Sequence, residues 1–429
     1  MTTSTTGTDD SLLARARRLL PGITQTYSKA PDQHVEGVYP VFLERGRGCH
    51  VWDVDGNFYI DYPGALGPMV LGYGDPEVDA AAGERVLAGP TFSLGHRLEV
   101  EVAELLVEMV PSAEKVRFLK TGSEATTAAV RLARAATGRE HVAMCGYHGW
   151  HDWCIGHTTR NAGVPAVVRE LTHLWTYNDL DSLRAVLTAH PGEVAAVIME
   201  PVGAEMPTSG FLAGVRALAD EHGALLIFDE VVTGFRLAAG GAQVHFGVLA
   251  DLATFGKAMA NGYPLAAVTG RAPLMEQIAS TVFISSTFGG DTVALAAALA
   301  TMRRIQRGGV IEHLWIQGAR LMEGFNALAS EYEVPARMIG LPPRRFVAFE
   351  GAAGTDANGV KGLLFQECLA RGVLLGNAHL ISLAHDDAAV EATVQAFDGA
   401  LAVVGRAVRR GEVTAQLRGR PPGEVFRRA

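Results

Sequence analysis

The stretch Leu225-Leu226-Ile227-Phe228-Asp229-Glu230-Val231-Val232-Thr233-Gly234-Phe235-Arg236 decides the fold. It begins as an apolar run of strand length and ends at a pair of carboxylates, Asp229 and Glu230. An acidic residue at the carboxyl end of a strand lies at the edge of an open α/β sheet where ligands bind. A second apolar run, residues 252–255, is followed closely by Lys257. Together the two runs predict a carboxylate and an amine that meet across one pocket.

A lysine and a carboxylate in one pocket are the groups on which pyridoxal phosphate (PLP) catalysis depends. The lysine forms a Schiff base with the cofactor, and the carboxylate keeps the pyridine nitrogen protonated so that the ring can accept electrons. Taken singly, Lys257 could be a solvated surface lysine and Asp229 a helix cap. Their combination favours the catalytic interpretation.

The wider motif resembles that of the class III aminotransferases, in which Asp-Glu-Val-x-Thr-Gly-Phe is followed downstream by Gly-Lys. Residues 229–235 and Gly256-Lys257 match it. The resemblance runs from about Pro21 to the helix after His385, nearest to the branch of glutamate-1-semialdehyde aminomutase, which includes aminotransferases of aminoglycoside biosynthesis. It implies a PLP-dependent enzyme of fold type I, with an α/β large domain around a mostly parallel sheet and a smaller α+β C-terminal domain.

The bulk properties of the chain exclude several classes of protein. With 429 residues and 48% hydrophobic side chains, it can bury a large core. A net charge of −9 argues against nucleic acid or an anionic membrane as partner, but not against a cationic substrate. The four cysteines form no C-x-x-C pair, which fits a reducing cytoplasm. Met1–Asp10 is expected to be a disordered tail, and no apolar run approaches the roughly 18 residues of a membrane helix.

Three segments are expected. Residues 1–70 form an N-terminal segment with a tail, a short helix and hairpins; residues 71–305 form the large PLP-binding domain; and residues 306–429 form the small C-terminal domain. Apolar runs alternating with helical patterns predict the mostly parallel sheet of the large domain.

A phosphate site is predicted where a short apolar run, residues 116–119, leads through Gly122-Ser123 into an alanine-rich helix. A helix that begins directly after a strand presents free backbone N–H groups and the positive end of its dipole to an anion. Ser123 could instead be a simple helix cap. The family resemblance assigns Gly122 and Ser123 to the PLP phosphate, and the glycines of a dinucleotide fingerprint are absent.

Further cofactor contacts follow from the resemblance. It places Tyr147 on one face of the pyridine ring and Val231 on the other, with Glu200 at the end of another strand. Thr287 matches a residue that reaches the phosphate of a partner subunit, so the chain is expected to form a homodimer with shared active sites. Next to Tyr147, the sequence His148-Gly149-Trp150-His151-Asp152 could hold a metal, but no further ligands follow and no metal is expected.

The substrate pocket departs from the aminomutase pattern. Lys29 stands where the mutase has an arginine for the substrate carboxylate, and Leu66 where it has a tryptophan. The loop that carries a glutamate in the mutase is shortened to Gly376-Asn377-Ala378-His379. Glu205 is expected near the substrate, and the carboxylates of Glu205 and Asp291 could attract a cationic substrate to the entrance. Neutral hydrogen-bonding groups at Asn377 and His379 would suit a bulky polar substrate.

These departures favour transamination between two substrates. The expected donor is glutamate or glutamine, and the expected acceptor is a carbonyl compound such as an oxidised aminosugar or aminoglycoside intermediate. Intramolecular amine transfer of the semialdehyde-mutase type and PLP-dependent epimerisation remain alternatives, because both use the same core residues. A PLP-binding regulator is disfavoured, because the sequence has no basic helix-turn-helix and no spare segment for one.

Overall fold

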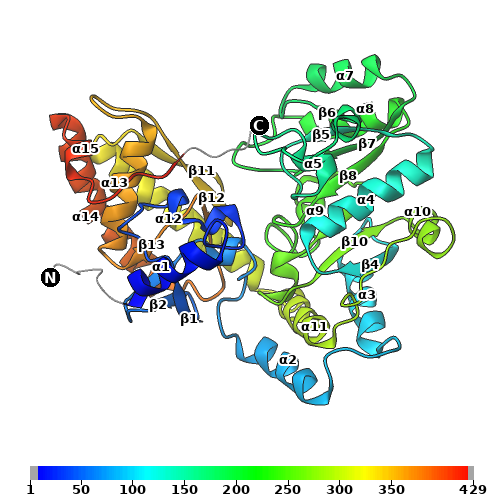
Figure 1. Cartoon of the computed structure of the whole chain (residues 1–429), viewed down its shortest axis with the longest axis horizontal. Helices are drawn as coiled ribbons and strands as arrows, with labels where there is room; N and C mark the ends of the chain where they lie inside the picture. The colour runs from blue at the N-terminus through cyan, green and yellow to red at the C-terminus, as the bar shows by residue number, and fades with distance from the viewer. Residues whose placement is uncertain (1–7, 424–429) are drawn as a thin grey trace. The chain divides into compact units, whose positions relative to one another are not determined.

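The structure is a computed structural model of the 429-residue chain, and it describes residues 8–423. The chain divides into two compact units (Figure 1). Unit 1 combines the residues up to Asp75 with those from His313 onward, and unit 2 is built from Pro76–Glu312.

Unit 2 is organised around a sheet that has seven strands in the described part of the chain. Every neighbouring pair is parallel except the two pairs that involve β10, which is antiparallel to both β4 and β9. In spatial order the strands are β4 (Lys115–Leu119), β10 (Ala266–Gly270), β9 (Leu252–Phe255), β8 (Leu225–Asp229), β7 (Val194–Met199), β5 (His141–Cys145) and β6 (Thr172–Leu174).

The central strands of this sheet are covered on both faces. All residues of β7 and β9 are buried, because continuous apolar runs suit strands with helices on either side. Since all strands but β10 run in one direction, their last residues share one edge, here called the carboxyl edge. The opposite edge, where the same strands begin, is called the amino edge.

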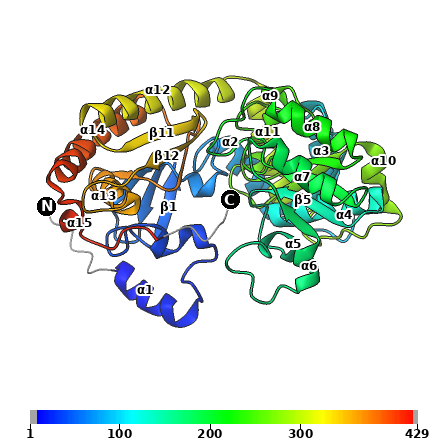
Figure 2. The ribbon, with the colours of Figure 1, turned by 90° about the horizontal axis from the view of Figure 1, so that it is seen from above.

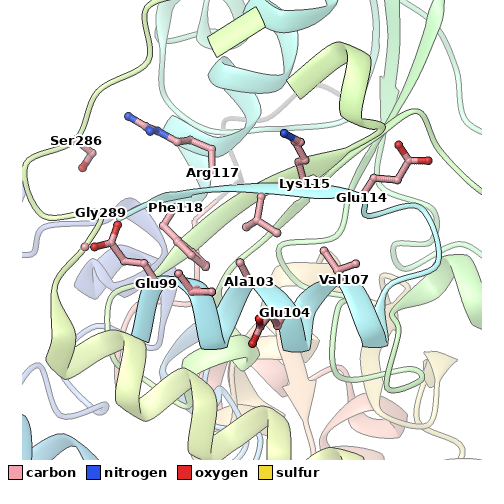
Figure 3. Close-up of a pocket in the computed structure, with 13 residues that line it drawn as sticks. Glu99, Ala103, Glu104, Val107, Glu114, Lys115, Arg117, Phe118, Ser286 and Gly289 are labelled. Atoms are coloured by element: carbon pink, nitrogen blue, oxygen red, sulfur yellow. The ribbon is translucent and has the colours of Figure 1, made fainter. Parts of the chain in front are cut away.

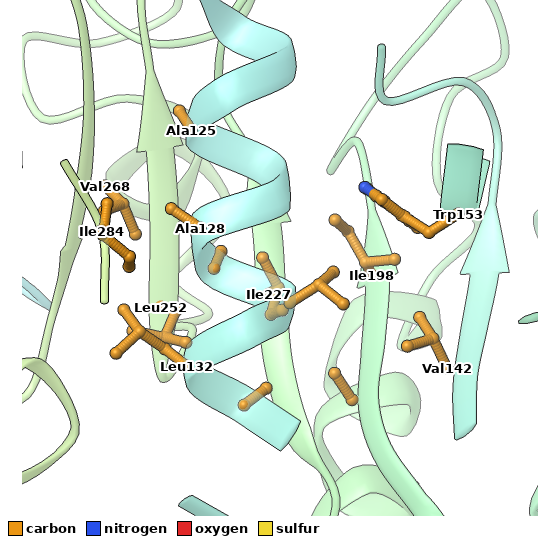
Figure 4. Close-up of a cluster of buried hydrophobic side chains, with 14 of the residues drawn as sticks. Ala125, Ala128, Leu132, Val142, Trp153, Ile198, Ile227, Leu252, Val268 and Ile284 are labelled. Atoms are coloured by element: carbon orange, nitrogen blue, oxygen red, sulfur yellow. The ribbon is translucent and has the colours of Figure 1, made fainter. Parts of the chain in front are cut away.

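Helix α4 (Gly122–Thr137) shows why small residues are placed against the sheet. Ala125, Ala128 and Leu132 point from the helix toward strand residues such as Ile227 (Figure 4). Alanine side chains let the helix lie close to the strands, and fully buried Leu132 contributes about 1.5–3 kcal/mol. A capping box formed by Thr121 and Glu124 fixes the helix start.

The other helices of unit 2 connect the strands or flank the sheet. They are α2 (Pro76–Ala88), α3 (Arg97–Met109), α5 (Asp152–Ile155), α6 (Ala166–Glu170), α7 (Leu180–Ala189), α8 (Phe211–Glu221), α9 (Ala242–Phe246), α10 (Ala272–Met275) and α11 (Thr292–Gln306), with the 3-10 turns η4 (Lys257–Ala260) and η5 (Glu276–Ala279).

Unit 1 contains two small sheets and the helices packed on them. The first sheet joins β1 (Leu43–Arg47), β2 (His50–Asp53), β3 (Phe58–Asp61) and β13 (Val373–Leu374), and the second joins β11 (Ala336–Leu341), β12 (Arg344–Phe349) and β14 (Ala378–Leu380). Its helices and turns are α1 (Thr8–Leu19), η1 (Tyr27–Lys29), η2 (Pro31–Gln33), η3 (Gly64–Leu66), α12 (Val310–Glu331, which begins in unit 2), α13 (Ala357–Leu369), α14 (Asp387–Arg410) and α15 (Val413–Gln416).

Helix α12 runs along β11 and β12 (Figure 2), and the Asn326 side chain bonds both backbone groups of Met338. Phe325 of α12 meets Phe397 of α14 edge to face, with ring centroids 5.1 Å apart. By length and composition alone, α14 could cross a membrane. Half of its most apolar window is buried inside the protein, as in a core helix.

The structure confirms most predicted elements and corrects four. The first helix begins at Thr8, so residues 8–10 are not part of a tail, whereas residues 1–7 lie outside the described residues. Apolar residues predict strands at 41–43 and 380–383, whereas the first and last strands of the structure are Leu43–Arg47 and Ala378–Leu380. The basic, proline-containing segment after Arg409 is expected to be solvated, but it contains α15, and Arg420 pairs with Glu36 in a β-bridge.

Candidate active site

The carboxyl edge of the seven-stranded sheet gathers the polar residues that the sequence singled out. Asp229 ends β8, and Lys257 comes two residues after the end of the neighbouring strand β9. On the other side of β8, Glu200 directly follows β7, and Tyr147 lies two residues beyond β5. The parallel topology therefore brings to one edge residues that are up to 110 positions apart in the chain, as expected for a ligand site of an open α/β sheet.

Asp229 is held in a fixed orientation at this edge. Only 6% of its surface is exposed, and its Oδ2 lies 2.8 Å from Nδ1 of His148. Its Oδ1 accepts a hydrogen bond from the backbone N–H of Val231 at 3.0 Å, and the Thr254 hydroxyl lies 3.4 Å away. A buried carboxylate with these donors is pre-oriented and can keep a cationic partner protonated.

His148 is the functional neighbour that sequence reasoning did not place. Its Nε2 lies 2.9 Å from the carbonyl oxygen of Cys145, while its Nδ1 faces Asp229. Both contacts are to oxygens that accept hydrogen bonds, so both are made at once only when both ring nitrogens carry protons. The sequence signal was its position directly after Tyr147, but only the fold shows that it contacts the carboxylate of β8.

The adjacent carboxylate, Glu230, has a different role. It is fully buried, and burial raises the pKa of its carboxyl group above the usual range. Its oxygens accept hydrogen bonds from the backbone N–H groups of Ala242 (2.6 Å) and Gln243 (3.1 Å) and from the Thr233 hydroxyl (2.9 Å). Glu230 therefore stabilises the start of α9 by accepting its first backbone N–H groups. Of the two carboxylates, Asp229 is then the one available to a ligand.

Lys257 occupies an unusual backbone conformation. Its φ is +45°, in the left-handed region that residues with a side chain seldom adopt. Such a conformation costs about 1–3 kcal/mol and persists only where the surrounding structure enforces it. Here the conformation opens η4 directly after Gly256, and Ala258, Met259 and the following residues are buried. Strain at a half-buried lysine at the carboxyl edge of the sheet agrees with a functional role for its amine.

The turn between β4 and α4 forms a backbone cradle. Gly122 is the first residue of α4, and a Cβ placed on it would lie 3.0 Å from a methyl group of Val231. Gly149, in the loop after β5, lies close to the same turn. Its φ is +115°, and a Cβ on it would lie only 2.4 Å from the hydroxyl oxygen of Ser123. The helix start, two close-fitting glycines and the Ser123 hydroxyl together suit an anion such as a phosphate.

The structure corrects the alternative role of Ser123. The cap of α4 is Thr121, whose side chain accepts from the Glu124 backbone N–H, and Ser123 lies inside the first turn. The Ser123 hydroxyl instead accepts from the backbone N–H of Trp150 at 3.3 Å. It thereby links the turn of α4 to the segment that carries Tyr147, which packs half-buried against the core.

Two predicted residues have structural partners of their own. The Glu205 carboxylate is exposed and accepts a hydrogen bond from the Asn178 amide at 2.6 Å. Asp291, another candidate for attracting a cation, caps α11 through the Val293 N–H and forms an ion pair with Lys120 at 2.8 Å. Among the acidic residues near this edge, Glu205 is thus more open to a ligand than Asp291.

Thr287 lies on an exposed turn, residues 285–290, rather than among the residues above. The turn packs on the end of β4, where a Cβ on Gly289 would meet the carbonyl oxygen of Phe118 at 2.8 Å. Beside it, α3, β4 and the turn enclose a cavity of about 560 Å³ (Figure 3). Its lining residues include Glu99, Arg117 and Ser286 but none of the residues predicted to bind PLP.

The remaining predicted substrate residues belong to unit 1. Lys29 is exposed at the end of η1, and Leu66 lies in η3, where four successive residues, 64–67, have positive φ. The Asn377 amide oxygen accepts from Nζ of Lys361 at 2.6 Å, and its side chain is exposed. His379 is fully buried with Nε2 3.0 Å from the Gly376 carbonyl, and burial lowers its pKa to about 3. Their contacts with substrate stay predictions.

Comparison with known proteins identifies the family. Residues 32–398 match the family described as Aminotransferase class-III. The chain belongs to the class III aminotransferases. It is 41% identical to glutamate-1-semialdehyde 2,1-aminomutase of Roseiflexus castenholzii (94% of this chain, 99% of the relative) and 37% identical to 3-aminobutyryl-CoA aminotransferase of Cloacimonas acidaminovorans (92% and 96%). Among solved structures, it resembles the FumI protein of Sphingopyxis sp. MTA144 in its PLP internal aldimine form, with a TM-score of 0.88, 33% identity and coverage of 96% and 98%.

Membership of the class III aminotransferases confirms the predicted fold class, the enzymatic activity and the cofactor, PLP. The residues at the carboxyl edge fit this cofactor. The N–H groups of the Gly122–Ser123 turn would suit its phosphate, the buried carboxylate of Asp229 would suit its ring nitrogen, and the amine of Lys257 would suit its covalent attachment. The individual residue assignments remain predictions, which substitutions can test.

Proposed function

We propose that this class III aminotransferase moves an amino group from glutamate or glutamine to the carbonyl group of a second substrate. The observation that carries the proposal is the placement of Asp229 and Lys257 at the ends of the adjacent parallel strands β8 and β9. Bound PLP supplies an electron sink that makes the proton next to the transferred amine acidic. Removing and returning that proton is then the task of the protein.

Lys257 is the residue suited to move the proton. With PLP and substrate bound, its Nζ, on a short 3-10 turn, would be the base that takes a proton from one carbon and gives it to another. Asp229, fixed by His148 and the Val231 N–H, would offer its negative charge to the ring nitrogen of the cofactor. The cradle of Gly122 and Ser123 would hold the phosphate, which would keep the reacting atoms in one orientation.

The acceptor that we propose is a bulky, polar, amine-bearing carbonyl compound, such as an oxidised aminosugar or aminoglycoside intermediate. Its support is the exposed Glu205 carboxylate and the net charge of −9, both of which favour a cationic molecule. The exposed Asn377 side chain offers a neutral hydrogen-bonding group to a polar substrate. The second candidate is intramolecular amine transfer, because a relative named glutamate-1-semialdehyde 2,1-aminomutase is 41% identical to the chain. Epimerisation at an amine-bearing carbon is a third use of the same residues.

Half-reactions with purified enzyme separate these candidates. The PLP form is mixed with glutamate, glutamine, a 6-aminosugar compound or 4,5-diaminovalerate, and conversion to the pyridoxamine form is followed by absorbance. We expect conversion by the donor and a preference for the 6-aminosugar compound over diaminovalerate in competition. A clear preference for diaminovalerate would instead support the mutase. Exchange of the Cα proton without release of a keto product would identify an epimerase.

We further propose that the enzyme is a homodimer in which Thr287 reaches the phosphate of the partner subunit. The support is a set of large apolar side chains that are exposed on two segments joined at Thr292. Leu94 and Phe283 are 85% and 81% exposed, and Phe288 is 58% exposed. The Thr292 hydroxyl lies 3.1 Å and 3.3 Å from the carbonyl oxygens of Gly89 and Pro90, which joins the two segments. Exposed large apolar side chains are typical of interaction surfaces.

Light scattering tests the homodimer. We expect the mass of two chains, and a monomer without activity when Leu94 and Phe283 are both replaced by lysine. An active wild-type monomer under assay conditions would refute the shared site. We also propose that the enzyme is cytoplasmic, because all four cysteines are buried and none forms a disulfide within the described residues, as in proteins of reducing compartments.

A further inference from the structure

A cluster of three histidines lies at the amino edge of the seven-stranded sheet, away from the strand ends that carry the predicted cofactor residues. His141 is the first residue of β5, His173 is the middle residue of β6, and His190 follows the end of α7. Each offers a ring nitrogen, and these atoms all lie within 4.8 Å of one another. In the part of the chain that the structure describes, this is the group of side chains with the spacing of metal ligands.

From this geometry we propose that His141, His173 and His190 bind a divalent late first-row transition metal ion, with Zn²⁺ as the leading candidate. Imidazole nitrogens are preferred ligands of this class of ion, whereas Mg²⁺ and Ca²⁺ prefer oxygen. The site is independent of the cofactor chemistry at the carboxyl edge. The predicted candidates His148 and His151 are not part of it, because His148 contacts Asp229 and Nδ1 of His151 contacts the Thr127 hydroxyl at 2.7 Å.

The spacing of the nitrogens supports a tetrahedral ion. Nδ1 of His141 and Nε2 of His173 are 2.7 Å apart, as in an N–H···N hydrogen bond between two neutral rings. A Zn²⁺ ion with Zn–N bonds of about 2.0–2.1 Å would hold two such nitrogens about 3.3 Å apart. Replacing the shared proton by the ion therefore requires these nitrogens to separate by only about half an ångström.

His190 completes the site by a ring rotation. Its ring packs over that of His173 with centroids 3.9 Å apart and planes 26° apart, and over that of His141 at 4.7 Å. Rotation about the Cβ–Cγ bond of histidine is soft, so a nitrogen of His190 can turn toward the other two at small cost. Three protein nitrogens leave the fourth position of the ion open to water or an external ligand.

Glu193 provides the outer carboxylate that metal-binding histidines need. Its Oε2 lies 3.5 Å from Nδ1 of His190 and 3.9 Å from Nε2 of His141. A carboxylate on the outer nitrogen of a histidine fixes the tautomer and makes the inner nitrogen a better ligand. In this cluster a single carboxylate faces the outer nitrogens of two ligands, which leaves Nδ1 of His141 and Nε2 of His190 for the ion.

The ion would bind three segments that are separate in the sequence and that only the folded sheet brings together. His141, His173 and His190 come from the starts of two parallel strands and the helix end before a third. The rings of His141 and His190 are about a quarter exposed, so an ion can enter from solvent. An ion that binds only the folded chain stabilises it by mass action.

The experiment uses holoenzyme without a histidine tag, stripped of metal and titrated with Zn²⁺ by calorimetry and with Co²⁺ by visible absorbance. We expect one ion per chain and a tetrahedral Co²⁺ spectrum. His173→Gln should weaken binding by more than about 100-fold, and Glu193→Gln by about 10- to 100-fold as for other outer carboxylates. His222→Gln, which changes a histidine beside the same edge but outside the cluster, should bind like the wild type.

Each result decides the proposal. Stoichiometric binding that His173→Gln and His190→Gln abolish, while PLP content and the circular dichroism spectrum are retained, supports the site. If His173→Gln fails to fold, His190→Gln alone decides. No stoichiometric uptake, or equal affinity in the cluster variants and His222→Gln, would show an adventitious ion only and overturn the proposal.

Discussion

The two edges of the seven-stranded sheet differ in what their side chains do. At the carboxyl edge, Asp229 is buried with donors on both oxygens, and Lys257 adopts a strained backbone conformation. At the amino edge, polar side chains join neighbouring segments, as when Nη1 of Arg139 lies within 3.0 Å of the carbonyl groups of Val194, His222 and Gly223. At the carboxyl edge, side chains are oriented for chemistry at a cost in folding stability, whereas the contacts at the amino edge stabilise the fold. Substitutions at the two edges should therefore separate catalysis from folding.

Lys257→Ala should have the largest effect. Without the amine there is no covalent attachment of PLP and no base for the proton, so turnover should fall by at least about 10³-fold, near the upper range for a general base. The fold and some PLP binding should persist through Gly122, Ser123 and Asp229. Borohydride reduction of the wild type followed by peptide mass spectrometry should label Lys257, and a label on another lysine would remove Lys257 from the mechanism.

Asp229→Asn should be the next most damaging change. The amide keeps the shape but loses the charge that favours a protonated ring nitrogen, at a cost of about 1.5–3 kcal/mol, or roughly 10- to 150-fold in turnover. The visible spectrum of the bound cofactor should shift as well. Turnover near that of the wild type would show that Asp229 only supports His148.

Gly122→Ala tests the cradle of the phosphate. The added methyl group would lie 3.0–3.1 Å from both methyl groups of Val231, so the turn must shift by a few tenths of an ångström. We expect PLP affinity to fall severalfold, measured by dialysis and fluorescence, with a smaller loss of turnover at saturating PLP. Gly83→Ala is the matched control, because a Cβ on Gly83 meets open space in α2.

Arg139→Ala should show the opposite pattern to the three substitutions above. Loss of its charged hydrogen bonds at the amino edge should cost about 1–3 kcal/mol of unfolding free energy and lower the melting temperature by several degrees. The kcat should be unchanged at a temperature where the variant is folded. A selective loss of kcat would break the distinction between the two edges.

The stability of the folded protein should also fall in acid, and this effect is smallest near neutral pH. Burial lowers the pKa of His379 and of His385 to about 3, against an ordinary value of 6.5. Their neutral forms therefore contribute stability that is fully present above pH 6.5 and is lost as pH falls toward 3. Nδ1 of His385 also accepts from the Ser382 N–H, a bond that protonation removes. Denaturant melts at pH 7.5 and 5 should show lower stability at pH 5, and a smaller difference in His385→Gln.

Much of the fold could be predicted from local patterns. Residues 194–199 form the predicted strand because a continuous apolar run can only be satisfied by burial on both faces. The turn at Gly122 and the alanine-rich helix after it follow from spacing in the same way. Asp229 and Lys257 could be selected because Asp229 ends one such strand and Lys257 comes two residues after another, and parallel strands end at one edge.

Contacts between distant segments could not be predicted, because they depend on register and topology. The sequence selected Asp229, but it did not show that Asp229 contacts His148 or that Glu230 binds the backbone at the start of α9. Nor did it show that Thr121 rather than Ser123 caps the helix. Local pattern sets which residues are strand, helix or turn, but side chains far apart in sequence meet only when packing fixes the order of the strands.

The histidines of the amino edge show the same limit most clearly. The sequence placed His141, His173 and His190 at separate positions with no ligand motif, and suggested only His148 and His151 as a metal cluster to be dismissed. The parallel pairing of β5 with β6 and β7 brings the three rings within reach of one another. Their convergence is a property of strand order, which is settled by burial of the whole sheet and not by any local run of residues.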